Sequence, residues 1–368
     1  MPFAEVSVMD QRRRVAERVL CDGLSISSAA REAGISRPTA YLWVKRAREA
    51  GIAYVEEKSR AAHVSPNATP AHIVEQLIHG KMERPFWGAK KIVRKLWNEE
   101  PPLCVRTADR ILKKHGLVRT RRPQEEMQRF EREACNELWQ VDFKGLGEKP
   151  WPYHLLSVLD DKSRFCLALL PVPGPDSKSV FGAFWEVFGE YGLPEQILSD
   201  NGDCFNSVRS SGGPTPFQAK LWLLGISTTH GRPRHPQTQG KVERFNGTLQ
   251  LEMGHELIKP SAEAARKVFG RFKEDYNWQR PHEALQMKVP GSIYSPSARK
   301  RPDRIPEHVP SGLGAWRKVH SNGYFSYKSR NYLAGKGLSG EHVEIREEDN
   351  GLGLYFANRR FAQVCPKV

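Results

Sequence analysis

Residues 138–172 read LWQVDFKGLGEKPWPYHLLSVLDDKSRFCLALLPV, and this stretch decides the class of the central fold. Three runs rich in aliphatic and aromatic residues, at 138–146, 153–159 and 164–172, are separated by a segment containing glycine and proline and by a DDKS turn. Runs of this kind predict three consecutive β-strands joined by short connections.

Helices and strands alternate downstream of the meander. We expect helices at 177–191, 216–224 and 238–253, and short strands at 196–198 and 226–229. Three strands in a meander, followed by alternating helices and strands, predict a mixed α/β sheet with helices on its faces.

Three acidic residues occupy unusual places in this pattern. Asp142 lies inside an otherwise apolar strand, where a carboxylate is costly to bury unless it meets a cation. Asp200 directly follows a strand, beside a tight DNG turn, and strand ends are where α/β sheets place ligand groups. Glu243 adjoins the apolar stripe of the last helix, so we expect it to face the sheet edge.

Carboxylate oxygens are the ligands that Mg²⁺ and Mn²⁺ prefer. Two such ions about 3.5–4 Å apart would activate a nucleophile and stabilise the leaving oxygen of a phosphoryl transfer. Spacing alone does not select these three acids, because a chain of this size has many. Asp160 and Asp161 are neighbours that we interpret as a turn, and Asp203 as a loop residue.

The first 120 residues predict two small helical units. In residues 10–51 a short helix, a glycine break and a cationic helix form a helix-turn-helix pattern, whose second helix enters the major groove of DNA. An ordinary three-helix bundle with solvated charges is the alternative. A second helical unit and a basic arm, VRTRRP, follow. The candidate DNA contacts are Arg37, Thr39, Lys45, Arg46 and Arg48 on the helix and Arg119, Arg121 and Arg122 on the arm.

Charge is divided unevenly along the 368 residues. The net charge of +15 divides into +11 for residues 1–123, −5 for 124–258 and +9 for 259–368. Basic flanks indicate a polyanionic partner, and an acidic middle is consistent with carboxylates that hold metal ions.

Composition excludes several classes of protein. Hydrophobic residues make up 39% of the chain, which rules out a wholly disordered protein. No apolar run approaches the roughly 18 residues of a membrane-spanning helix, and no secretory signal is evident. The six cysteines are scattered without a CxxC pair, which argues against zinc and disulfide scaffolds and favours a reducing, cytoplasmic location.

The order of several longer strings is more specific than the three acids. LWQVDFKG, VLDDKSR, LSDNGDCF, GRPRHPQTQGKVERFNGTLQLE and YNWQRPHEAL, over about residues 135–300, resemble the core of bacterial insertion-sequence transposases of the DDE type. These enzymes belong to the retroviral-integrase superfamily, which has a ribonuclease-H-like fold.

The resemblance implies a site and a reaction. Asp142, Asp200 and Glu243 would be the catalytic ligands of two Mg²⁺ or Mn²⁺ ions. Water would cut a phosphodiester at the element end, and the freed 3′-hydroxyl would then attack another phosphodiester without a covalent enzyme intermediate. Double-stranded element-end and target DNA, a homo-oligomer on that DNA and a nucleoid-associated location are implied as well.

The chain departs from the family pattern in two places. Asp200 and Glu243 are further apart than in many members, with the excess in a loop-like stretch at 208–218. Related enzymes often have Lys or Arg two helical turns after the glutamate, where this chain has Gln250. Lys241 or Arg244 is expected to supply that cation. DNA-facing roles are also expected for His235, Gln239, Lys241 and Arg244 around the start of this helix.

Short runs broken by glycines from about residue 313 to 364 predict a small antiparallel β-barrel that binds DNA or mediates oligomerisation. The expected domains are a helix-turn-helix domain (1–58), a second helical domain with the basic arm (66–123), a ribonuclease-H-like core (134–260), a helical extension and basic linker (261–304) and the β-barrel (305–368). The alternative function is a helix-turn-helix regulator or a catalytically dead transposon remnant.

Overall fold

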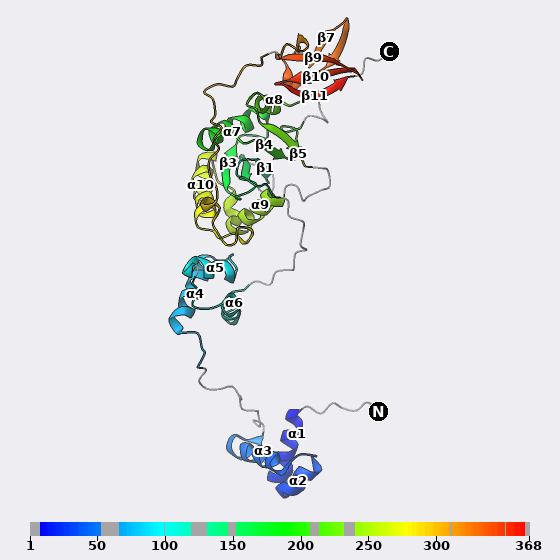
Figure 1. Ribbon diagram of the computed structural model, residues 1–368. Coiled ribbons are helices and arrows are strands. Elements are labelled where there is room, and N and C mark those ends of the chain that lie inside the picture. The colour runs from blue at the N-terminus through cyan, green and yellow to red at the C-terminus, as the bar shows by residue number, and fades with distance from the viewer. Residues whose placement is uncertain are drawn as a thin grey trace, which may run out of the picture. The chain divides into compact units, whose positions relative to one another are not determined.

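A computed structural model describes residues 8–52, 66–98, 100–118, 131–145, 152–206, 213–231, 240–309, 311–349 and 351–364. The chain divides into two compact units, residues 1–68 and 69–368. Figure 1 shows the order of the helices and strands along the chain.

The first unit is a three-helix domain. It consists of α1 (Val8–Leu20), α2 (Ile26–Glu32) and α3 (Arg37–Ala50). The hydroxyl of Ser36 accepts a hydrogen bond from the backbone N–H of Thr39 at 3.3 Å, which caps the start of α3. Ala40, Val44 and Ala47 on one side of α3 are buried where this helix packs against α1 and α2.

The second unit begins with another helical group. It contains α4 (Ala71–Glu83), α5 (Ala89–Trp97) and α6 (Val105–Lys114). Leu77, Trp87, Ile92 and Leu112 form its core, while the basic side chains of α5 and α6 lie mostly on the outer faces. Such an arrangement follows from the apolar residues recurring every three to four positions.

A five-stranded mixed sheet is the centre of the second unit. Its spatial order is β3-β2-β1-β4-β5, with β1, β2 and β3 antiparallel and β4 and β5 parallel to β1. The strands are β1 (Leu138–Lys144), β2 (His154–Asp160), β3 (Cys166–Val172), β4 (Gln196–Ser199) and β5 (Ser227–His230). The meander followed by parallel strands confirms the mixed sheet predicted from the sequence.

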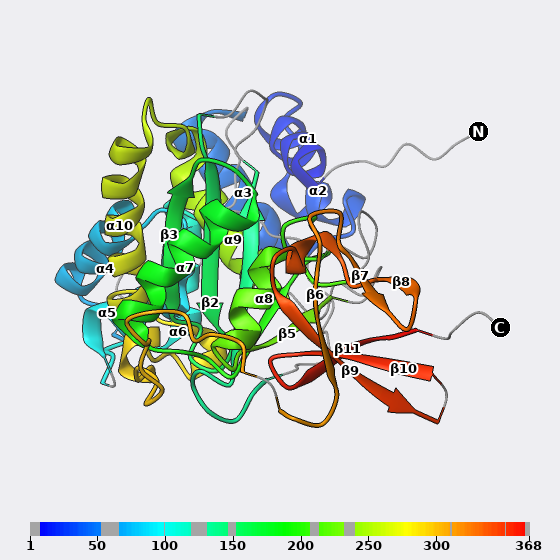
Figure 2. The ribbon, with the colours of Figure 1, turned by 90° about the horizontal axis from the view of Figure 1, so that it is seen from above.

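Helices cover both faces of this sheet. They are α7 (Ser177–Tyr191), α8 (Pro216–Leu223), α9 (Gly240–Met253) and α10 (Ala262–Trp278), with short 3₁₀ turns at Gly254–Leu257, Glu283–Leu285 and Pro290–Ser292. One core packs α7 and α8 against one face, and a second packs α9 and α10 against the other. The helix α7 lies along the strands in Figure 2.

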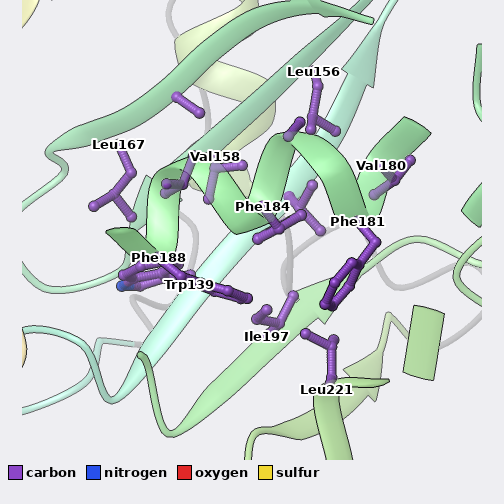
Figure 3. Close-up of a cluster of buried hydrophobic side chains, with 14 of the residues drawn as sticks. Trp139, Leu156, Val158, Leu167, Val180, Phe181, Phe184, Phe188, Ile197 and Leu221 are labelled. Carbon is purple, nitrogen blue, oxygen red and sulfur yellow. The ribbon is translucent and has the colours of Figure 1, made fainter. Parts of the chain in front are cut away.

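Alternation along the strands decides which side chains reach each face. Leu156 and Val158 of β2 join Phe184 and Phe188 of α7 in the first core, as Figure 3 shows. Leu155 and Leu159 belong to the second core, under α9 and α10. Along β1 the same alternation directs Trp139, Val141 and Phe143 toward α7 and leaves the even-numbered residues on the α9 face.

The C-terminal part differs from the expected closed barrel. The strands β6 (Ala315–Lys318), β9 (His342–Glu348), β10 (Gly351–Phe356) and β11 (Arg359–Val364) form an open sheet in the order β11-β10-β9-β6. The strands β7 (Tyr324–Tyr327) and β8 (Arg330–Leu333) pair only with each other, and a 3₁₀ turn covers Lys336–Leu338. Among the described residues, the edge strands β6 and β11 pair neither with each other nor with the hairpin, so the sheet is open.

The open sheet has its own core around Phe325, Leu338, Val343 and Leu354, to which α8 contributes Ala219. Among the described residues, no helix combines the length and the apolar character needed to cross a lipid bilayer.

Candidate active site

Asp142 lies in β1 on the sheet face covered by α9. It pairs across the sheet with Ser157 of β2, and both residues adjoin Asn246 of α9. The side-chain amide of Asn246 donates a hydrogen bond to Asp142 Oδ2 at 2.8 Å and accepts one from the Ser157 hydroxyl at 2.9 Å. Asn246 therefore fixes the orientation of the Asp142 carboxylate from the helix side.

Asp200 stands beside Asp142 because of the parallel register between β1 and β4. Gln140 is paired with Leu198, so the next residues on the same face, Asp142 and Asp200, lie at the same level of the sheet. The Asp200 Oδ1 atom accepts the backbone N–H of Gly202 at 3.0 Å. This short turn holds the second carboxylate at the end of β4.

His230, at the end of β5, supports the segment that carries Asp200. Its Nδ1 lies 3.0 Å from the Ser199 hydroxyl and 3.3 Å from the Asp200 carbonyl, and its Nε2 lies 2.9 Å from the Gln218 side-chain amide. Burial lowers the pKa of His230. A neutral imidazole that bridges these groups ties the Asp200 turn to β5 and α8.

Glu243 lies in the first turn of α9, as the sequence indicates, but its side chain is exposed. The buried side of that helix is formed by Val242, Phe245, Asn246 and Leu249. Glu243 is near enough to Asp142 for its negative charge to act on that carboxylate.

Burial and neighbouring charges together change the acidity of Asp142. Burial raises its pKa most, the negative charge of Asp200 raises it further, and Glu243 adds a smaller effect, giving a pKa of about 6. Hydrogen bonds from the Phe143 backbone and the Asn246 side chain act in the opposite direction. A positive charge beside Asp142 and Asp200 would therefore stabilise their ionised forms.

Asp142, Asp200 and Glu243 do not all converge on one point in the described part of the chain. Within the described segments, no set of three His, Cys, Asp or Glu side chains lies close enough to hold a metal ion. The structure brings Asp142 and Asp200 together and leaves Glu243 near them, facing solvent.

Lys241 has a different environment from the one expected. Its ammonium lies 2.6 Å from Asp161 Oδ2, and its side chain is only 15% exposed. Asp161, which we interpreted as a turn residue, is completely buried. The Lys241 ammonium is therefore held by Asp161 inside the core, whereas Arg244 and Gln250 are exposed on α9.

The predicted DNA contacts on α3 are mostly on its outer face. Arg37, Lys45 and Arg48 are exposed, and Lys45 makes an ion pair of 4.0 Å with Glu49. The Thr39 hydroxyl lies 2.7 Å from that of Ser36, so it belongs to the helix cap. Arg46 is half-buried. Five predicted contacts lie outside the described residues: Arg119, Arg121, Arg122, His235 and Gln239.

Sequence reasoning missed three residues around the acids, Gln140, Asn246 and His230, and assigned Asp161 only to a turn. Gln140, Asn246, Asp161 and His230 are polar yet buried or half-buried next to the carboxylates or their supporting elements. The only signal for Asn246 was its position in the apolar stripe of α9, three residues after Glu243. Gln140 gave a similar signal, as a polar residue two positions before Asp142 in an apolar strand.

Family models match three parts of the chain. Two models of an integrase core domain match residues 132–236 and 224–290, and a model of a helix-turn-helix domain matches residues 11–61. The chain thus has an integrase core domain, preceded by a helix-turn-helix domain.

Individual relatives agree with these models. A 31.7 kDa protein of insertion element IS407 from Burkholderia multivorans is 24% identical over 62% of this chain and 83% of its own length. A putative transposase of IS5376 from Geobacillus stearothermophilus is 25% identical over 62% of this chain and 58% of its own length. The Gag-Pro-Pol polyprotein of Mason-Pfizer monkey virus is 33% identical over 36% of this chain and 7% of its own length.

Proposed function

We propose that this chain is an insertion-sequence DNA transposase of the DDE type, with an integrase-like core that cuts and joins DNA at the ends of a mobile element. It is a nucleotidyltransferase, and its helix-turn-helix domain binds DNA. The proposed location of this reaction is the cytoplasm, on nucleoid DNA.

The position of Asp142 beside Asp200, which follows from the parallel register of β1 and β4, supports this proposal most directly. Burial, and then the negative charge of Asp200, raise the pKa of Asp142 to about 6, and a divalent cation would oppose this rise. Aspartate and glutamate oxygens are the ligand type that Mg²⁺ and Mn²⁺ prefer, so the chemistry of these side chains suits such ions, and we propose that two bind. Asp142, Asp200 and Glu243 would hold them.

Divalent cations at this place would supply nucleophile activation and charge stabilisation for phosphoryl transfer. The residues of the chain have separate tasks. Asn246 orients the Asp142 carboxylate, and His230 with Ser199 holds the turn that carries Asp200. Arg37, Lys45 and Arg48 on α3 meet DNA phosphates or bases, because α3 presents them on its outer face.

The further DNA contacts are proposed on the same grounds of charge and position. Arg46 and Thr39 of α3, the arm residues Arg119, Arg121 and Arg122, and His235, Gln239 and Arg244 near α9 complete this set. Two element ends must be brought together for joining, so we propose a homo-oligomer on DNA. A helix-turn-helix regulator with an inactive core is the second candidate, favoured only by the outward position of Glu243.

The test is cutting and joining of the DNA that flanks the gene. Purified protein with Mn²⁺ or Mg²⁺ should nick the element ends and transfer them to target DNA. Asp200→Asn and Glu243→Gln should each abolish both steps and keep end binding in a gel-shift assay, because they remove only cation-holding oxygens. Asp203→Asn, an exposed neighbour, is the matched control and should cut normally.

Two outcomes count against the proposal. Equal cutting by the wild type and by both acidic variants would remove the assigned site. Specific end binding by a wild type that never cuts, with any divalent ion, would favour the regulator.

A further inference from the structure

A buried polar cluster lies beneath the start of α9, next to the proposed site. It consists of Gln140 in β1, Asp161 after β2 and Lys241 in the first turn of α9. Gln140 is 1% exposed and Asp161 is fully buried. Buried polar groups of this kind are costly unless they are bonded to one another.

The contacts within the cluster form one continuous chain. The Lys241 ammonium lies 2.6 Å from Asp161 Oδ2. It also donates a hydrogen bond to the backbone carbonyl of Asp161 at 3.0 Å. The Asp161 Oδ1 atom accepts the Gln140 side-chain amide at 2.8 Å. The Gln140 Oε1 atom accepts the backbone N–H of Val242 at 3.3 Å.

Each end of this chain of contacts adjoins a proposed metal ligand. Gln140 is two residues before Asp142 and shares its sheet face, because side chains alternate along a strand. Lys241 and Val242 directly precede Glu243. The first N–H groups of a helix have no partner within the helix, so the Gln140 contact with Val242 fixes the start of α9.

Two arginines outside the cluster also donate hydrogen bonds to Asp161. The backbone N–H of Arg132 donates to Asp161 Oδ2 at 2.8 Å, and Arg164 donates to the Asp161 carbonyl. Breaking a buried ion pair on one side leaves an uncompensated charge, which is more disruptive than removing both charges.

We propose that Gln140, Asp161 and Lys241 are positioning residues, which set the first turn of α9 so that Glu243 can join Asp142 and Asp200 in holding divalent cations. This inference rests on the proposed function. It assigns Lys241 to the support of the site rather than to DNA, and it gives a role to a half-buried lysine two residues before a proposed catalytic acid.

The first test compares Lys241→Met with Lys241→Arg in the full-length protein. Binding of Mn²⁺ is followed by electron paramagnetic resonance, and strand cutting is measured against Mn²⁺ concentration. Lys241→Met should weaken Mn²⁺ binding and raise the half-saturating concentration about 10- to 100-fold, as for other residues that orient metal ligands. Lys241→Arg, which keeps the charge, should recover most of the loss.

Controls separate positioning from general stability. Lys259→Met removes a lysine of similar exposure, 20%, from another ion pair of the same unit and should leave Mn²⁺ binding unchanged. The double variant Lys241→Met/Asp161→Asn removes both charges, so it should melt near the wild-type temperature and still bind Mn²⁺ weakly.

Wild-type Mn²⁺ binding by the double variant would overturn the proposal. A double variant that melts far below the wild type would also overturn it, because the cluster would then hold the fold instead of the site. A wild-type protein that binds Mn²⁺ but never cuts would contradict the proposed function alone, since the Mn²⁺ readout still tests positioning.

Discussion

Replacing Asp142 by asparagine should make the metal-free protein more stable while abolishing cutting. The carboxylate is partly buried beside Asp200, and its pKa is raised from 3.8 to about 6. A shift of about two units corresponds to about 3 kcal/mol of unfavourable interaction when the group is ionised. Asparagine has nearly the same shape and can still accept the Asn246 hydrogen bond.

The stability gained by Asp142→Asn should increase as pH rises. Because the folded-state pKa lies above the unfolded-state value, the unfolded state releases the Asp142 proton first, and wild-type stability falls as pH rises from about 4 to about 6. The Asn variant lacks this loss. The two proteins should therefore be nearly equal at pH 4, and the variant should be more stable by about 2–3 kcal/mol at pH 8.

The assay is calorimetric melting of full-length protein in EDTA from pH 4 to 8. The transition that Mn²⁺ raises in the wild type identifies the core, since ligands stabilise only the unit that binds them. That transition should lie higher in Asp142→Asn at pH 8 and should respond little to Mn²⁺. Asp203→Asn serves as the exposed control. An Asp142→Asn protein that is less stable at pH 8, or equally shifted at every pH, would refute the reasoning.

The remaining predictions concern activity and binding. At Mn²⁺ concentrations below saturation, cutting should decline as pH falls through about 6, because a proton on Asp142 competes with the cation; an unchanged rate at pH 5 under these conditions would contradict this. Deleting residues 1–123 should remove sequence-specific end binding; a retained footprint on the ends would move recognition to the C-terminal half. His230→Ala should weaken Mn²⁺ binding several-fold by releasing the Asp200 turn, whereas His230→Gln, which can bond Ser199, should retain more affinity.

Several elements were predictable because local patterns decide them. The helix α7 has the bounds predicted for it, 177–191, and α3 is the cationic helix predicted within residues 10–51. The strand meander followed from runs of apolar residues between turn residues. The small C-terminal β-barrel is not confirmed, because strand lengths and glycines do not reveal which edges pair over long distances.

The environment of Lys241 could not be predicted from the sequence either. A basic residue in a basic, polar string favours a DNA contact, and nothing local shows that Asp161 is buried within reach of it. The orientation of Glu243 is a similar case, because a residue beside an apolar stripe can face either the sheet edge or the solvent.

The sequence alone determined which residue types are present, the order of the helices and strands, and the placement of three acids in a strand, after a strand and on a helix. The tertiary structure decided which of these meet. Parallel pairing of β1 with β4 places Asp142 beside Asp200, and the packing of α9 on β1 and β2 brings Asn246 to Asp142 and Lys241 to Asp161. Contacts between residues some 20 to 100 positions apart depend on register and packing, and no local pattern encodes those.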